Sequence, residues 1–271
     1  MIWCRYAFCR VADDLVDDAP TAAAAEVAIE VINHHLSLLY ADLTEKPSLS
    51  EIARKNLQLL PQPLRSAFHL LATLDIPRAP LDELVTGFRT DLRFDSTLPV
   101  ESEKNAGLPI RTDTDLVEYS QNVASSVAEL CVRLVWKNEG YGITTEEERR
   151  VIIIAAREMG VALQLVNICR DVPADLKIGR MYLPGVSFDA TTEQKTFERR
   201  RLLELAEKMA IASRSKIELL PLAGRNGIRA ACAVYLQIGE AVLKDLNEGK
   251  FESRASASKL SRFRVAWNAL S

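Results

Sequence analysis

One stretch of the chain, residues 160–184, carries acidic and amide side chains at the spacing of a helix. Intervals of four, three, four and four residues place one set on a single helix face, and its members are Gly160, Gln164, Asn167, Asp171 and Asp175. Two carboxylates one turn apart repel each other by roughly 3 kcal/mol at an effective dielectric of about 20. Carboxylate and amide oxygens are the ligands that Mg²⁺ prefers, so this face predicts a site for a divalent cation.

The same stretch supplies an apolar stripe and positive charge. The stripe is expected to pack into a core, and it consists of Val161, Leu165, Ile168 and Val172. Arg170 and Lys177 offer charge for an anion such as a phosphate. An isolated Asp-x-x-x-Asp pair is more typical of a solvated helix face, so a second motif has to support the metal hypothesis.

That second motif lies near the start of the chain. Arg10, Asp13 and Asp17 are spaced by three and four residues within CRVADDLVDD. Four aspartates fall within six residues there, between apolar neighbours. Two such helices facing each other would bind divalent ions that carry a diphosphate.

Composition narrows the class of protein. The formal net charge of −3 over 271 residues gives no electrostatic footprint for nucleic acid. Five cysteines are odd in number and lack C-x-x-C spacing, which predicts reduced, buried thiols. Three histidines, His34, His35 and His69, are too few and too scattered for a zinc site.

Hydrophobic periodicity predicts helices throughout, without β-alternating segments. The predicted helices cover residues 2–18, 21–43, 64–74, 81–94, 115–138, 145–171, 191–220, 225–247 and 255–269, with a polar linker at 45–50. We find no internal repeat, no domain linker and no run approaching 18 apolar residues. The prediction is one all-α domain over residues 1–271 that neither spans a membrane nor carries a secretory signal. Its first helix starts without a cap, so we expect a further segment to precede it.

Taken together, these motifs resemble the phytoene and squalene synthase family, and more closely the phytoene synthases. The matching segments are YAFCRVADDLVDD at 6–18, EYSQNVASSVAEL at 118–130 and ALQLVNICRDVPADLKIGRMYLP at 162–184, with a weaker match at 229–238 and at Arg254 and Lys259. The resemblance implies a type I isoprenoid synthase helical fold around a central apolar cavity. It also implies two Asp motifs on opposing helices that bind Mg²⁺, with Mn²⁺ as an alternative ion.

The resemblance assigns roles to individual residues. Metal would be held by Asp13 and Asp17 on one side and by Asn167, Asp171 and Asp175 on the other. Diphosphate would be contacted by Arg10, Gln164 and Arg170, and the substrate also by Tyr235. Tyr119 matches a family tyrosine near the reacting centre, and the implied catalytic residues are Tyr119, Arg10 and Arg170. Either tyrosine read alone is equally well an ordinary core residue.

The implied reaction joins two geranylgeranyl diphosphates head to head, through prephytoene diphosphate, to phytoene. Ionising an allylic diphosphate requires its leaving charge to be neutralised, and the carbocation has to be kept from water by an apolar pocket. A non-catalytic relative that serves as a binding or assembly factor is one alternative, and a squalene synthase that uses a nicotinamide is another.

Three departures from the family pattern stand out. A Ser-Phe-Tyr-like motif ahead of the first acidic helix is absent, so activity of this length of chain is in doubt. Ser125 and Ala128 stand where the family has glycines, which is expected to change the pocket width. Pro173 between the two aspartates is expected to kink the helix and turn Asp175 off the metal face.

The residues of both acidic motifs are similar to those of fungal enzymes in which a phytoene synthase domain follows a membrane-bound lycopene cyclase. The expected partners are therefore prenyl diphosphates and a fused cyclase domain. We expect the chain on the cytoplasmic side, soluble or peripheral to a membrane, and tethered to it if it belongs to a bifunctional protein.

Overall fold

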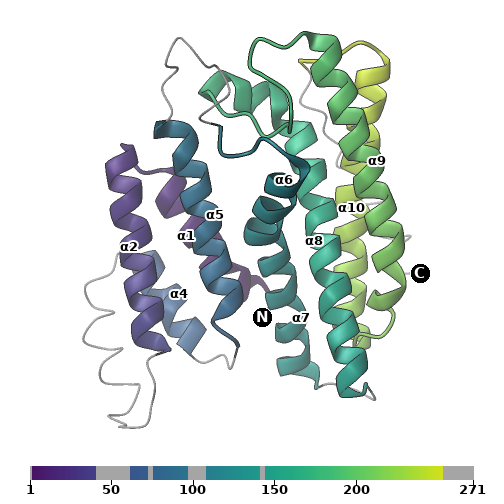
Figure 1. Ribbon diagram of the computed structural model, residues 1–271. Coiled ribbons are helices and arrows are strands. Elements are labelled where there is room, and N and C mark those ends of the chain that lie inside the picture. Colours follow the sequence, from purple (N-terminus) through teal and green to yellow (C-terminus); the bar gives the residue numbers. More distant parts are fainter. Residues whose placement is uncertain (1, 41–61, 73–75, 97–107, 141–143, 253–271) are drawn as a thin grey trace. The chain divides into compact units, whose positions relative to one another are not determined.

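The computed structural model describes residues 2–40, 62–72, 76–96, 108–140 and 144–252, and every regular element within these ranges is helical (Figure 1). This confirms the predicted all-α class. The chain divides into two compact units, residues 1–92 and 93–271. The predicted linker at 45–50 and the predicted helix at 255–269, with Arg254 and Lys259, lie outside the described residues.

Aromatic rings hold the first unit together. Its helices are α1 (Ile2–Asp17), α2 (Ala22–Leu39), α4 (Gln62–Ala72) and most of α5 (Ala79–Ser96). The ring centroids of Phe8 on α1 and Phe68 on α4 are 5.2 Å apart, and the ring of His35 on α2 lies 5.6 Å from that of Phe68. The Nδ1 atom of His35 lies 2.8 Å from the carbonyl oxygen of Val31. His35 is thus part of the core of this unit.

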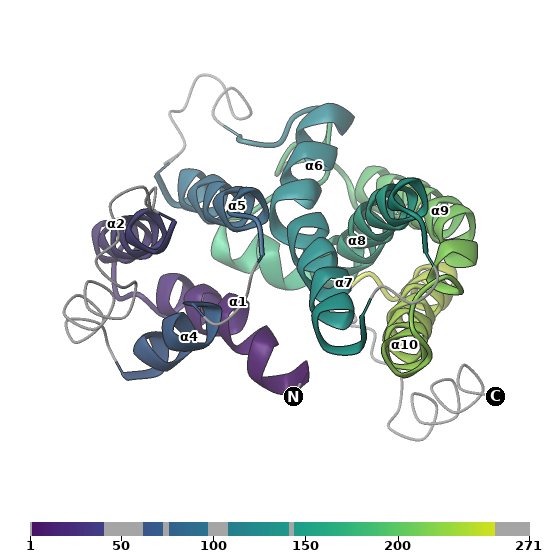
Figure 2. The same ribbon diagram turned by 90° about the horizontal axis from the view of Figure 1, so that it is seen from below.

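The second unit is a bundle in which α8 is central. Its elements are α6 (Asp113–Ser120), the π-helix η1 (Gln121–Ser125), α7 (Ser126–Glu139), α8 (Glu146–Asp175), the 3₁₀ turn η2 (Leu176–Ile178), α9 (Thr192–Ile217) and α10 (Leu222–Asn247). Figures 1 and 2 show α8 among α7, α9 and α10. Threonine capping boxes start α6, α8 and α9, because Thr112, Thr145 and Thr191 each exchange hydrogen bonds with the residue three positions later.

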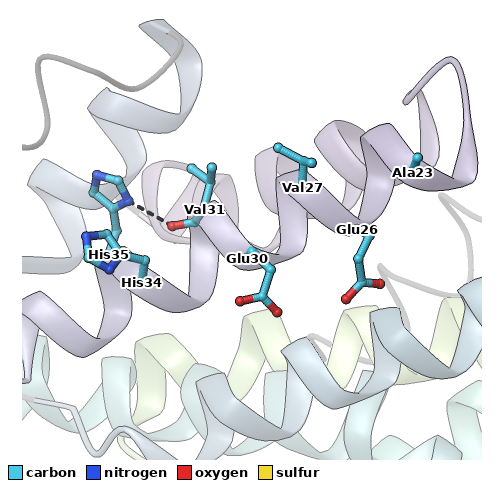
Figure 3. A pocket seen from close by; sticks show the side chains of 7 residues that line it. All are labelled: Ala23, Glu26, Val27, Glu30, Val31, His34 and His35. Carbon is cyan, nitrogen blue, oxygen red and sulfur yellow. Dashed lines mark hydrogen bonds between the residues drawn. The ribbon is translucent and has the colours of Figure 1, made fainter.

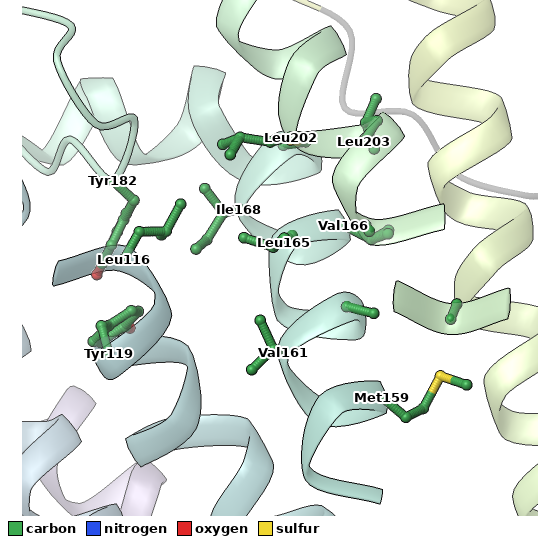
Figure 4. Close-up of a cluster of buried hydrophobic side chains, with 14 of the residues drawn as sticks. Leu116, Tyr119, Met159, Val161, Leu165, Val166, Ile168, Tyr182, Leu202 and Leu203 are labelled. Carbon is green, nitrogen blue, oxygen red and sulfur yellow. The ribbon is translucent and has the colours of Figure 1, made fainter. Parts of the chain in front are cut away.

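The buried face of α8 is the predicted apolar stripe. Val161, Leu165, Ile168 and Val172 are all buried in the core of this unit, and Figure 4 shows the first three beside side chains of α6 and α9. The helix was predicted to end near Asp171, and this is wrong, because α8 continues through Pro173 to Asp175. Asp175 therefore remains part of the helix that carries Asp171.

Helix α8 is also the segment to consider for crossing a membrane. Among the described residues, Glu146–Ile178 is the single helical segment long and apolar enough to cross a membrane. Half of the apolar window in this segment is buried inside the structure.

Candidate functional site

The acidic end of α8 carries its own counter-ion. The Arg170 Nε atom donates a hydrogen bond of 2.9 Å to Asp171 Oδ1, and its Nη2 atom donates to Asp171 Oδ2. Both side chains are about one fifth exposed, at 21% and 20%. The Asp171 hydrogen bond raises the pKa of Arg170 above its ordinary value, and the charge of Asp175 contributes. The structure thus brings together three of the predicted site residues on one helix.

An amide oxygen without a partner lies one turn before this ion pair. The Oδ1 atom of Asn167 is buried and accepts no hydrogen bond from any described residue. Its amide nitrogen lies 3.4 Å from Gln164 Oε1, so the two predicted side chains contact each other. A buried carbonyl oxygen left unpaired costs roughly 1–3 kcal/mol, which marks a position where a ligand would be stabilised.

Tyr235 lies in the neighbourhood of Arg170. It is on α10, is 36% exposed, and is close enough to Arg170 to interact with it electrostatically. The prediction placed Tyr235 in the substrate site, and the structure brings it to the cationic end of the α8 motif. Its assignment to substrate stays a prediction.

Tyr119 lies in an aromatic group within the second unit. It is only 6% exposed, and its ring stacks on that of Tyr182 at 5.2 Å, while Tyr182 also contacts Phe94 at 4.8 Å. Figure 4 shows Tyr119 and Tyr182 side by side, with Leu116 next to them. Tyr182 belongs to the GRMYLP segment, so packing joins two of the three motifs. The sequence assigned no role to Tyr182, although the GRMYLP segment contains this residue.

The helical segment between α6 and α7 is distorted at Ser125, one of the two positions where the family has glycine. Residues 121–125 form a π-helix, a local widening that often occurs at functional sites. Ser125, in place of a family glycine, is fully buried, and its Oγ donates a 2.6 Å hydrogen bond to the carbonyl oxygen of Arg157 on α8. The substituted side chain therefore fastens η1 to α8.

Gly160 makes this close approach feasible. A Cβ atom on Gly160 would lie 2.7 Å from the Cα atom of Ser125 and 2.9 Å from the carbonyl oxygen of Ala124. We predicted Gly160 on the polar face of the helix, and this is wrong, since it is buried against η1. Spacing alone could not separate a glycine needed for packing from a member of the acidic face.

A small apolar cavity opens beside this contact. It has a volume of about 160 Å³ and lies between α7, α8, α9 and α10, with Ala128, Cys131, Met159, Gly160 and Leu163 in its wall. Ala128, the other replaced glycine, thus lines the cavity. Cys131 was predicted as a buried thiol and is exposed instead, whereas Cys169 and Cys232 are buried as predicted.

The α1 motif is organised differently. Arg10 Nη2 lies 2.7 Å from Asp14 Oδ1, whereas its Nη1 is 3.6 Å from Asp13 Oδ2. Burial, followed by the charge of Asp17, raises the pKa of Asp13 to about 6. The structure therefore places Asp13 and Asp17 close enough to interact, with Arg10 turned mainly to Asp14. That they face the carboxylates of α8 stays a prediction.

A hollow of about 550 Å³ lies along α2 and does not resemble a binding site. Figure 3 shows its wall, in which Glu26 and Glu30 point the same way and His34 lies at one end. All of its lining residues come from this one helix, so it is an open helix face. Neither acidic motif contributes to it.

The donor set on α8 fits Mg²⁺ when phosphate oxygens complete it. Within the described residues, no group of three or more His, Cys, Asp or Glu side chains could hold a metal ion unaided. Mg²⁺ is usually bound by one or two carboxylates together with waters and substrate phosphates. Asp171, Asp175 and the unpaired Asn167 oxygen match that all-oxygen requirement.

Comparison with known proteins identifies the family of this chain. A model of the squalene/phytoene synthase family matches residues 1–264. The chain belongs to this family. Proteins of the squalene/phytoene synthase family use prenyl diphosphates as substrates.

Fungal relatives of this squalene/phytoene synthase chain are bifunctional proteins. It is 38% identical over 277 residues to a bifunctional lycopene cyclase/phytoene synthase of Phaeosphaeria nodorum, covering 98% of this chain and 45% of that protein. A protein of the same description from Gibberella fujikuroi is 37% identical over 279 residues, covering 98% and 46%. The chain spans about half the length of the curated relatives it matches.

A solved structure of the same class supports the fold. The crystal structure of a dehydrosqualene synthase in complex with ligand matches with a TM-score of 0.59 at 20% identity, covering 98% of this chain and 94% of that one. This likeness confirms the predicted isoprenoid synthase fold.

Proposed function

We propose that the chain is a Mg²⁺-dependent prenyltransferase that condenses two geranylgeranyl diphosphates head to head, through prephytoene diphosphate, to phytoene. Family membership and the phytoene synthase relatives support the reaction. The observation that carries the site is the buried, unpaired Oδ1 atom of Asn167, one turn before an Arg170–Asp171 ion pair. An anion with its metal would satisfy all three groups.

Asp171, Asp175 and Asn167 would hold one metal group, and Asp13 with Asp17 another. Bound Mg²⁺ would neutralise the negative charge that develops on the departing diphosphate. Gln164 lies next to Asn167 and would fix the orientation of that amide, so that its oxygen points at the ligand.

Arg170 is the side chain that would change partners. Without substrate it neutralises Asp171 in a two-point contact. With metal and diphosphate bound, Asp171 would bind the cation, and the guanidinium would bind phosphate oxygens in the same planar, two-point manner. Arg10 would act similarly beside α1. In this exchange Arg170 and Asp171 would each have an oppositely charged partner in both states, so neither state would leave one of these charges unpaired.

The apolar surroundings would protect the carbocation formed when diphosphate leaves. Tyr119 is buried and stacked on Tyr182, so few waters can reach that region of the second unit. The final step on the way to phytoene removes a proton, and the departing diphosphate or Tyr119 would accept it.

Product analysis tests this function. The full chain is incubated with geranylgeranyl diphosphate and Mg²⁺, without nicotinamide, and the products are separated by chromatography and identified by mass. We expect an unreduced forty-carbon hydrocarbon. Product that forms only after NADPH addition would favour the squalene-type reaction, and absence of product even when the family's N-terminal segment is restored would favour the non-catalytic alternative.

We also infer that the chain works beside a lycopene cyclase domain on the cytoplasmic side of a membrane. The relatives are bifunctional lycopene cyclase/phytoene synthases, and the chain covers about half of their length, which supports this inference. Immunoblotting of the native protein tests it, since a fused protein would be about twice the 30.2 kDa of this chain. A native species of the chain's own size would contradict the fusion.

A further inference from the structure

A buried arginine on α9 lies against the acidic end of α8. Arg199 is 1% exposed, and its Nε atom donates a 2.8 Å hydrogen bond to the carbonyl oxygen of Cys169. Its Nη1 atom donates to the carbonyl oxygen of Phe251 at 3.2 Å, and its guanidinium lies 5.1 Å from the centre of the Phe251 ring. Burying a cation is costly unless its donors are satisfied. This side chain therefore requires a structural or functional reason.

The carbonyl group of Cys169 supplies that reason. In an α-helix the carbonyl oxygen of residue 169 accepts from the backbone N–H of residue 173. Residue 173 is proline, which has no N–H and whose ring crowds this same carbonyl. Cys169 is fully buried, so water cannot replace the missing donor. The Arg199 Nε atom occupies the position of that donor.

The contact is reciprocal. The Cys169 Sγ atom donates to the carbonyl oxygen of Arg199 at 3.4 Å, so each side chain binds the backbone of the other residue. Two hydrogen bonds thus join α8 and α9 at Cys169, one turn before Pro173.

We propose that Arg199 is a positioning residue for the acidic motif: its guanidinium replaces the amide donor that Pro173 lacks and holds Asp171 and Asp175 on one continuous helix. The observed path of α8 agrees, because the helix continues two residues past the proline. Arg199 has no part in binding metal or substrate. The consequence for metal binding rests on the proposed function, whereas the replacement of the donor does not.

A double-mutant cycle between residues 199 and 173 tests the replacement. Arg199→Met leaves the Cys169 carbonyl without its donor, and we expect the midpoint of thermal unfolding to fall by about 5 °C or more. Pro173→Ala restores the backbone N–H, so Arg199→Met in that background should lower the midpoint by less than half as much. Equal losses in both backgrounds would overturn the proposal.

Arg200→Met is the matched control. The Arg200 Nη2 atom donates to the carbonyl oxygen of Leu246 at 3.1 Å, so this neighbouring arginine also binds a backbone carbonyl. Arg200→Met should lower the midpoint of thermal unfolding by the same amount whether residue 173 is proline or alanine. If Arg199→Met does not fold, the cycle is run with Arg199→Gln, whose amide N–H is a weaker donor. Arg199→Gln should then be rescued by Pro173→Ala, and lack of rescue would overturn the proposal.

Calorimetry with Mg²⁺ and pyrophosphate measures the effect on positioning. In variants that fold, Arg199→Met should weaken pyrophosphate binding about tenfold, as for other groups that orient metal ligands, and Pro173→Ala should restore it. Unchanged affinity in folded Arg199→Met would overturn the positioning role. Failure of the unmodified chain to bind Mg²⁺ with pyrophosphate would count against the proposed function, while the unfolding cycle would still decide the donor replacement.

Discussion

The acidic motifs of α1 and α8 share their spacing and differ in their electrostatics. On α8, Arg170 lies directly on Asp171, so the charge of that carboxylate is neutralised. On α1, Arg10 turns mainly to Asp14, and Asp13 is left with a raised pKa beside another carboxylate. The position of the arginine produces this difference, because it is adjacent to the aspartate in one motif and one turn away in the other. Identical Asp-x-x-x-Asp spacing therefore gives one motif whose first aspartate is paired directly with an arginine and one whose arginine pairs mainly with the next aspartate.

Turnover should be the most sensitive measure of either motif. Asp171→Asn and Asp13→Asn each remove a carboxylate of the proposed metal groups, so product formation should fall at least about 100-fold, the upper end of the cost of losing a group that merely orients a ligand. Product formation from geranylgeranyl diphosphate measures this. Asp18→Asn, an exposed aspartate outside the proposed ligand set, is the control. An Asp171→Asn enzyme with unchanged turnover would refute its role.

The backbone of α8 should tolerate less change than a helix position in open space. Gly160→Ala would drive its Cβ into the backbone of η1, and overpacking of this kind costs about 1–3 kcal/mol. Gly227→Ala on α10 is the matched control, because a Cβ there meets nothing within 4 Å. The control should gain roughly 0.5–1 kcal/mol from helix propensity. Urea unfolding of both variants checks the contrast, and a neutral Gly160→Ala would contradict the close contact.

Replacing the first aspartate of each motif by asparagine should change the stability of the protein in opposite directions. Asp171→Asn removes the hydrogen-bonded counter-ion of the half-buried Arg170, so the free energy of unfolding should fall by about 1 kcal/mol without metal. Asp13→Asn relieves repulsion from Asp17, so the free energy should rise. Unfolding in EDTA at pH 7 measures both. Changes of the same sign would remove this electrostatic distinction between the two motifs.

The smallest expected effect is the pH dependence that Asp13 contributes. Its pKa is raised from 3.8 to about 6, so protonated Asp13 favours the folded state. This contribution is complete below pH 3.8 and is lost as the pH rises through 6. Because the side chain is 44% exposed, we expect less than about 1 kcal/mol after solvent screening. Asp13→Asn should flatten the stability profile between pH 4 and 6, and an unchanged profile would contradict the assignment.

Hydrophobic periodicity was sufficient to predict the helices and the buried face of α8. Val161, Leu165 and Ile168 are buried because a stripe at helical spacing has to meet a core. The capping boxes at Thr112 and Thr145 are local in the same sense, since each joins residues only three positions apart. The squalene/phytoene synthase family could also be predicted, because three motifs occur together.

Contacts between distant residues could not be predicted. The sequence showed that Pro173 removes a hydrogen bond, which suggested a kink, but it did not show that Arg199 restores the donor from 26 residues away. Serine in place of the family glycine at position 125 suggested a different pocket width. The sequence did not show that the Ser125 hydroxyl donates a hydrogen bond to the carbonyl oxygen of Arg157 on α8. The partner of Arg10 also depended on side-chain rotamers, which spacing leaves undetermined.

The capping boxes of the second unit have a consequence for the order of folding. Each start signal involves residues only three positions apart, so Thr112, Thr145 and Thr191 favour three helical nuclei independently of any distant contact. Local nuclei of this kind lower the loop-closure entropy that opposes the transition state. The reciprocal bonds between Cys169 and Arg199 join two of these helices and can form only after both exist. Substitutions at the caps should therefore slow refolding, and substitutions at the junction should mainly accelerate unfolding.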